Sequence, residues 1–317
     1  MEATPRPDPK TLIDPPTLMR IKSLEVRARV VVEGFFRGMH KSPFHGFSVE
    51  FSEYRAYTPG DDPRYLDWKL FARSDRYHVK RFEDETNLRC QIVLDTSRSM
   101  GYGTIGYTKI EYARTAAATL AYFLATQRDA CGLITFEDRI VEFIPARYRP
   151  GHLRRILAVL EREPTGRVTD LAGPIEEVAA AVRRRGLIVL LSDLLADASR
   201  LRTRLGYLRS QGHDVVVLRI LDPAEVGLTF EAPAMFRDVE SGRELYVDPA
   251  QARAEYRRRF DTHADEIRRA CLDLGIEYET ITTDRPLELV LFDLLRARMR
   301  RGRHPGRRTA SRRGGPA

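Results

Sequence analysis

The chain has 317 residues, of which 43% are hydrophobic and 31% are charged, a composition typical of a folded globular protein. This length predicts one main core with an accessory part. No apolar run approaches the roughly 18 residues of a membrane-spanning helix, and the first residues, MEATPRPDPK, lack the apolar core of a signal peptide. We therefore expect a cytoplasmic protein with no membrane span.

The net charge of +8 comes from the carboxyl-terminal end of the chain. Residues 296–317 contain nine arginines and no acid, so the rest of the sequence is close to neutral. Residues 301–317 have almost no large apolar side chains, and we expect them to form a disordered basic tail. Clustered arginines also attract phosphate, so an association with nucleic acid or an anionic membrane through this tail stays open.

The three cysteines, Cys90, Cys131 and Cys271, are widely separated and form no CxxC pair. Each stands in an apolar strand or helix pattern, which predicts buried thiols rather than a disulfide or a zinc site.

The first 87 residues differ in pattern from the rest of the chain. Apolar residues recur at helical spacing over residues 15–39, and residues 41–85 are rich in aromatic and turn-forming residues. We predict an N-terminal helix and a small β-rich subdomain over residues 1–87. Turn chemistry explains much of PGDDPRYLDW in this segment, because Pro59-Gly60 suits a type II turn. A role of Asp61, Asp62 and Asp67 near a partner or a second metal stays open.

Residues 88–300 alternate between short apolar runs and amphipathic patterns, which predicts an α/β domain. Its apolar strands call for a Rossmann-like, mostly parallel sheet with helices on both faces. A β-hairpin insertion is predicted near residues 233–248, followed by a helix that begins at Asp248 and Pro249. His213 precedes a strand and is expected at the surface. The predicted strands are 89–95, 131–136, 140–144, 187–193, 214–221 and 276–283, with 131–144 forming a hairpin.

The stretch IVLDTSRSM (residues 92–100) runs an apolar strand into Asp95, Ser97 and Ser99. Ligands of parallel sheets collect at the carboxyl ends of the strands, where the strand order reverses. Asp193 ends a second apolar strand, and Thr169 precedes the helix before it. Two carboxylates and three hydroxyls are hard oxygen ligands that suit Mg²⁺, whereas nitrogen and sulfur ligands for zinc or copper are missing from the set.

The pattern D-x-S-x-S, then Thr169, then Ser-Asp at the end of another strand, resembles the metal-ion-dependent adhesion site of von Willebrand factor A domains. The resemblance covers about residues 88–285. It implies a Rossmann-like fold that binds Mg²⁺ or Mn²⁺ and leaves one coordination position for an acidic side chain of a partner. Ser97, Ser99 and Thr169 would be hydroxyl ligands, and Asp95 and Asp193 would bind directly or through water.

The segment RAYTPGDDPRYLDWKLFAR (residues 55–73), followed by KRFEDE and the DTSRSM strand, resembles the bacterial domain of unknown function 58 family. Genes of that family commonly lie beside those of MoxR-type AAA+ ATPases. Many members carry N-terminal transmembrane helices, whereas this sequence resembles the shorter, soluble type. The resemblance implies a protein-binding module that works as adaptor or partner of a MoxR-type AAA+ ATPase.

The same residues allow alternative functions. Helix capping would explain Asp95 and the two serines but predicts nothing about Thr169 or Asp193. A metal-dependent hydrolase or phosphoryl-transfer enzyme using Asp95 stays open, although the second aspartate of the haloacid dehalogenase pattern is replaced by Ser97. GYGTIG at residues 101–106 satisfies G-x-G-x-x-G but does not follow its strand directly, so we expect a loop beside the metal site. We identify no catalytic residue and expect no enzymatic activity.

Overall fold

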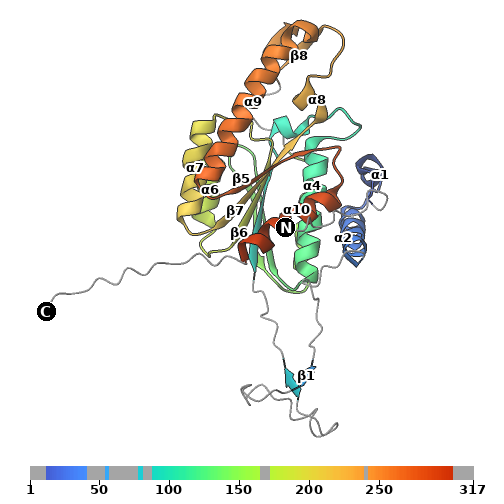
Figure 1. The fold of residues 1–317 in the computed structure, drawn as a ribbon, viewed down its shortest axis with the longest axis vertical. Coiled ribbons are helices and arrows are strands. Elements are labelled where there is room, and N and C mark those ends of the chain that lie inside the picture. Colours follow the sequence, from blue (N-terminus) through green and yellow to red (C-terminus); the bar gives the residue numbers. More distant parts are fainter. Residues whose placement is uncertain are drawn as a thin grey trace, which may run out of the picture.

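A six-stranded sheet forms the centre of the computed structural model, which describes residues 12–40, 54–56, 78–80, 88–164, 172–238 and 242–302 (Figure 1). The strand order is β10-β7-β6-β3-β4-β5. Neighbouring strands are parallel except for β5, which is antiparallel to β4 at the edge of the sheet. The strands are β3 (Arg89–Asp95), β4 (Ala130–Phe136), β5 (Ile140–Arg147), β6 (Leu187–Ser192), β7 (Asp214–Leu221) and β10 (Glu277–Thr282).

Helices cover both faces of this sheet (Figure 1). Strand side chains alternate between the faces, so Ile92 and Leu94 of β3 join one core while Val93 joins the other. The predicted α/β fold with a mostly parallel sheet is therefore confirmed. One face packs against α2 (Leu24–His40), α4 (Lys109–Thr126), α5 (His152–Leu160) and α10 (Leu287–Gly302), and the other against α6 (Ala172–Ala181), α7 (Ala198–Ser210) and α9 (Pro249–Asp273).

The sequence predicts these strands and helices because each of them buries apolar side chains at regular spacing along the chain. Pro174 lies in the first turn of α6, where its missing N–H costs no helical hydrogen bond. Asp248 caps α9 by accepting from the Ala250 N–H, with Pro249 in the first turn as expected. The predicted burial of all three cysteines is also confirmed.

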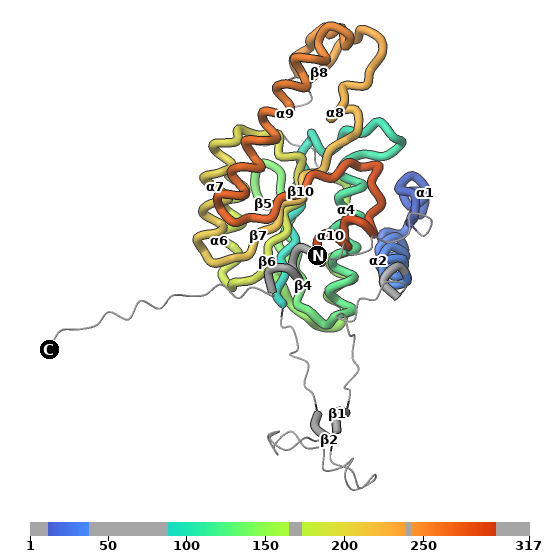
Figure 2. Tube along the Cα trace, in the orientation of Figure 1, coloured from blue at the N-terminus to red at the C-terminus, as the bar shows by residue number. Residues whose placement is uncertain are grey.

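The predicted hairpin insertion is present as β8 (Ala234–Arg237), which pairs antiparallel with β9 (Glu244–Val247). Gly242 has a φ of 71°, the left-handed backbone that a hairpin turn needs and glycine adopts without steric cost. In Figure 2 this hairpin and the first half of α9 project past the carboxyl edge of the central sheet. The fold also contains the short helices α1 (Pro15–Met19) and α8 (Pro223–Gly227), a 3-10 turn η3 (Arg98–Gly101), and a pair of short strands, β1 (Tyr54–Ala56) and β2 (His78–Lys80).

The predicted N-terminal helix is present as α2, but it begins later than the helical pattern over residues 15–39 indicates. The Arg27 guanidinium donates to the carbonyls of Met19 and Ile21 and holds a turn that separates α1 from α2. Ser23 then caps α2 by accepting from the Val26 N–H at 3.3 Å. His213 is buried rather than exposed, because its ring Nε2 hydrogen bonds the Val182 carbonyl at 3.0 Å.

Helix α2 belongs to the main core, since its apolar stripe packs with α4 on the sheet. Most of the predicted β-rich subdomain, Thr169 and the basic tail lie outside the described residues. Within the described ranges, no helix is both long enough and apolar enough to cross a bilayer.

Candidate metal site at the carboxyl edge of the sheet

Strand β3 lies at the point where the order of the sheet reverses. Its neighbours are β4, the next strand along the chain, and β6 on the opposite side. The carboxyl end of such a strand opens into the crevice where α/β proteins bind ligands. Asp95 is the last residue of β3 and is completely buried. The predicted position of Asp95 in the sheet is therefore confirmed.

Both oxygens of the Asp95 carboxylate accept hydrogen bonds from neighbouring loops. The Ser97 N–H donates to Oδ1 at 2.9 Å, and the Ser192 hydroxyl at the end of β6 donates to Oδ2 at 2.6 Å. The Ser97 and Ser99 hydroxyl oxygens lie 3.2 Å apart in the turn that follows. Three of the predicted ligands, Asp95 and the two serines, thus meet within one buried turn.

The environment of Asp95 disfavours an uncompensated negative charge. Burial, followed by the nearby Asp193 carboxylate, raises the pKa of Asp95 to about 7, against the opposing effect of its serine hydrogen bonds. The electrostatic effect of Asp193 also shows that the two aspartates from β3 and from the end of β6 are neighbours. A cation placed between them would relieve both the desolvation cost and the repulsion.

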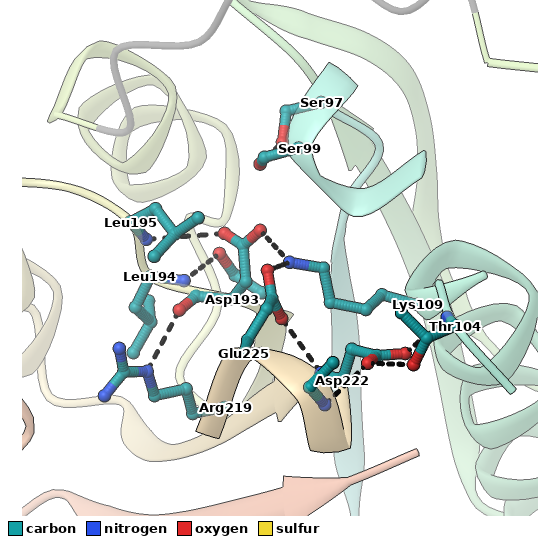
Figure 3. A network of polar contacts seen from close by, with 12 residues as sticks. Ser97, Ser99, Thr104, Lys109, Asp193, Leu194, Leu195, Arg219, Asp222 and Glu225 are labelled. Atoms are coloured by element: carbon teal, nitrogen blue, oxygen red, sulfur yellow. Dashed lines mark hydrogen bonds and ion pairs between the residues drawn. The ribbon is translucent and has the colours of Figure 1, made fainter. Parts of the chain in front are cut away.

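Asp193 forms a buried ion pair that the sequence does not predict (Figure 3). Its Oδ2 lies 2.9 Å from the Lys109 ammonium, which also contacts the Glu225 carboxylate at 2.6 Å. Burial by itself lowers the pKa of Lys109, but Asp193 and Glu225 outweigh it and the net shift is upward. The other oxygen of Asp193 accepts from the Leu195 N–H at 3.3 Å.

The GYGTIG loop is attached to the same network through Thr104. The Thr104 N–H and hydroxyl donate to the two oxygens of Asp222, at 2.8 and 2.5 Å. Asp222 also caps α8 by accepting from the Ala224 N–H. A Cβ added to Gly103 would lie 2.1 Å from the Tyr107 carbonyl oxygen, so only glycine fits at this point of the loop. The loop therefore lies at the edge of the candidate site, as predicted, without a nucleotide-binding geometry after the strand.

A fully buried arginine completes the cluster. Arg219 of β7 donates from Nε to the Asp193 carbonyl at 3.0 Å, and its guanidinium lies 5.2 Å from the centre of the Phe260 ring. Its Nη2 donates to His263 Nδ1, and His263 Nε2 in turn donates to the Ala196 carbonyl at 2.8 Å. These contacts fix the loop after β6 that carries Asp193.

Negative charge exceeds positive charge in this cluster. The cluster holds four carboxyl groups, those of Asp95, Asp193, Asp222 and Glu225, and two cations, Lys109 and Arg219. The pKa of Tyr102 responds to the same field: burial, then Asp222 and Glu225, raise it to about 12.

The donor set fits a hard divalent cation. Across the described parts of the chain, no group of three or more His, Cys, Asp or Glu side chains forms a metal cluster, so a cation at this place would need hydroxyl groups for part of its coordination. Ser97 and Ser99 offer two adjacent hydroxyls, and a carboxylate oxygen that accepts one hydrogen bond still has a free lone pair. Asp193 is paired with Lys109, which suits binding through water better than direct coordination. Thr169 lies outside the described residues.

Sequence reasoning missed Lys109, Glu225 and Arg219. A local signal for Lys109 exists, because Thr108 and Glu111 form a capping box that places this lysine in the first turn of α4. A cation there opposes the helix dipole and calls for a carboxylate partner. The Asp222-Pro-Ala-Glu225 sequence is a similar capping signal for α8. No sequence signal pairs these two helix starts with each other.

The fold and this site define the class of the protein: a helix-covered, mostly parallel sheet with D-x-S-x-S at the end of its central strand is the von Willebrand factor A-like arrangement predicted from the sequence. The chain belongs to the family described as "Protein of unknown function DUF58", whose profile matches residues 53–270. It is 30% identical over 277 residues to uncharacterized proteins of Mycobacterium tuberculosis and Mycobacterium bovis, covering 86% of this chain and of each relative.

Solved structures with a similar trace include the conserved hypothetical protein BatB of Bacteroides thetaiotaomicron, which is 14% identical. That match covers 67% of this chain and 99% of BatB, with a TM-score of 0.44. The VWA domain of SpRpn10 is also 14% identical and covers 65% of this chain and 94% of that domain, with a TM-score of 0.42.

Proposed function

We propose that this protein is a metal-dependent protein-binding module, in which Mg²⁺ or Mn²⁺ is held at the carboxyl edge of the sheet by Asp95, Ser97 and Ser99. Thr169 and Asp193 complete the proposed set, directly or through water. The observation that carries the proposal is the buried Asp95 carboxylate, which lies beside two adjacent hydroxyls in a cluster where carboxyl groups outnumber cations.

The chain's own residues prepare this site for a cation. Ser192 and the Ser97 N–H orient the Asp95 carboxylate, and Lys109 holds Asp193 in place at the next strand end. The two serine hydroxyls carry no charge, and Asp193 is already paired. A bound cation would supply a positive charge that its direct ligands compensate only in part, and an open coordination position for a partner's Asp or Glu.

The proposed partner is a MoxR-type AAA+ ATPase, for which this protein would act as adaptor without catalysis of its own. Support for this partner is membership of the family, whose genes commonly lie beside those of such ATPases. AAA+ ATPases use cytoplasmic ATP, so the proposed interaction takes place in the cytoplasm. Support for the absence of catalysis is Ser97, which occupies the place where phosphatase chemistry needs a second aspartate.

Calorimetric titration with Mn²⁺ and Mg²⁺ tests the metal site. The wild-type protein should bind one ion, Asp95→Ala should bind none, and Asp261→Ala should bind like wild type because Asp261 is exposed on α9. Equal binding by all three proteins contradicts the proposed site. Affinity capture from the host, with and without EDTA, then tests the partner: the proposal requires a MoxR-type ATPase that is released by the chelator.

A further inference from the structure

A hollow of about 630 Å³ lies at the opposite end of the sheet from Asp95. It lies between the end of β5, the start of β3 and β6, and the residues that follow α6. Helix α6 ends at Ala181 and leaves this part of its sheet face uncovered. The volume is in the range of roughly 300 to 1,000 Å³ that small-molecule sites occupy.

An irregularity in the edge strand shapes this hollow. The register of β5 against β4 shifts between Leu133 and Cys131, where Pro145 and Ala146 of β5 face the single residue Gly132. Two side chains of β3 donate hydrogen bonds to backbone carbonyls of this part of β5. Gln91 donates to the Ile144 carbonyl at 3.2 Å, and Arg89 donates to the Ala146 carbonyl at 3.4 Å. Bulges of this kind redirect side chains at sheet edges and beside functional sites.

Among the described residues, the charged side chains that line the hollow are all positive. Five arginines line it, and no Asp or Glu appears among its described lining residues. None of the five has a carboxylate partner in the part of the chain that the structure describes. Because the chain before residue 296 is close to neutral, this is a local concentration of charge. The arginines are Arg89, Arg147, Arg149, Arg183 and Arg184.

A neighbouring histidine responds to the same field. His152 begins α5 and is buried against the Cys131 carbonyl. Burial lowers the pKa of His152, and the charges of Arg149, Arg155 and Arg147 lower it further. A positive potential therefore extends around the end of β5.

Two aromatic side chains lie among these arginines. Phe143 is 40% exposed and Tyr148 is 55% exposed, and both line the hollow. Exposed aromatic rings stack on planar ligands, and guanidinium groups bind phosphate oxygens with two parallel hydrogen bonds. We propose that this hollow binds a nucleoside polyphosphate, with the arginines on its phosphates and an aromatic ring against its base.

Calorimetric titration in EDTA and low salt tests this site without involving the metal site. The probes are ATP, inorganic tripolyphosphate, adenosine and a decaglutamate peptide. The test variant, Arg147→Gln with Arg183→Gln, removes two exposed arginines of the hollow. Its control, Arg257→Gln with Arg269→Gln, removes the same charge from the exposed side of α9.

The wild type and the control should bind ATP and tripolyphosphate, and the test variant should bind both roughly 10- to 100-fold more weakly, as expected for lost charge-assisted hydrogen bonds. Tyr148→Ser should weaken ATP binding and leave tripolyphosphate binding unchanged. Failure of tripolyphosphate to bind the wild type, or equal affinities in the test variant and control, would overturn the proposal. Equal affinity for ATP and tripolyphosphate would overturn the nucleoside assignment, and binding of the peptide alone would show that the hollow takes an acidic protein segment instead.

Discussion

Replacement of Asp95 by Asn should stabilise the metal-free protein at alkaline pH. A pKa of about 7 in the folded state, against 3.8 for an ordinary aspartate, corresponds to about 4 kcal/mol by which folding disfavours the ionised carboxylate. The asparagine has no charge and keeps the acceptor for the Ser97 N–H. It alters the hydrogen bond from Ser192, at a cost of about 1 kcal/mol. The expected net gain is therefore about 2 to 3 kcal/mol.

The effect should depend on pH in a defined direction. The unfolded chain releases the Asp95 proton near pH 3.8, whereas the folded chain keeps it until about pH 7. Between these values the folded state binds more protons, so this group's contribution to stability is full below about pH 4 and is lost as the pH rises through 7. The asparagine variant lacks this contribution to the pH dependence, and its advantage should be largest at pH 8 and small at pH 5.

Urea denaturation in EDTA, followed by circular dichroism at pH 5 and pH 8, measures both effects. Asp261→Asn serves as the matched control, because Asp261 is exposed and its replacement should change stability by less than about 0.5 kcal/mol. Addition of Mn²⁺ should then stabilise the wild type but not Asp95→Asn. A variant less stable than wild type at pH 8 in EDTA would refute the reasoning, since it would mean that the protein already compensates the Asp95 charge.

Three further changes test the rest of the site. Lys109→Met should cost about 3 to 5 kcal/mol of stability in urea denaturation, because it leaves the buried Asp193 and the partly buried Glu225 without their cation; a loss under 1 kcal/mol would contradict this. Ser99→Ala should weaken Mn²⁺ binding by about tenfold or more in calorimetry, and an unchanged affinity would remove this hydroxyl from the proposed ligands. Gly103→Ala should lower the melting temperature, because its Cβ would lie 2.1 Å from the Tyr107 carbonyl oxygen. Gly101→Ala, where a Cβ meets nothing within 4 Å, is the control, and equal melting temperatures would contradict the steric argument.

The strands of the sheet could be predicted because a strand that is buried on both faces is a short run of apolar residues in the sequence. Residues 187–191 are apolar at every position, and in the structure β6 is buried along its whole length between β3 and β7. The antiparallel pairing of β4 and β5 followed from the three-residue turn between them. The start of the N-terminal helix could not be predicted, because the apolar stripe continues across the break before α2, while the break itself depends on side-chain hydrogen bonds from Arg27.

The candidate site shows the same division between local and long-range information. Asp95, Ser97 and Ser99 are neighbours in the chain, so a strand that ends at Asp95 brings them together whatever the rest of the fold does. Glu225 lies 116 residues from Lys109, and nothing local to either residue identifies the other.

The sequence by itself determined the alternation of strands and helices and the short turn of candidate oxygen ligands after the central strand, because these depend on the spacing of residues close together in the chain. Only the tertiary structure decided that Lys109 pairs with Asp193 and Glu225, that Ser192 binds Asp95, and that carboxyl groups outnumber cations in the cluster. The reason is electrostatic: the free energy of a buried charge depends on every group within a few ångströms, and the order of strands in the sheet sets which groups those are.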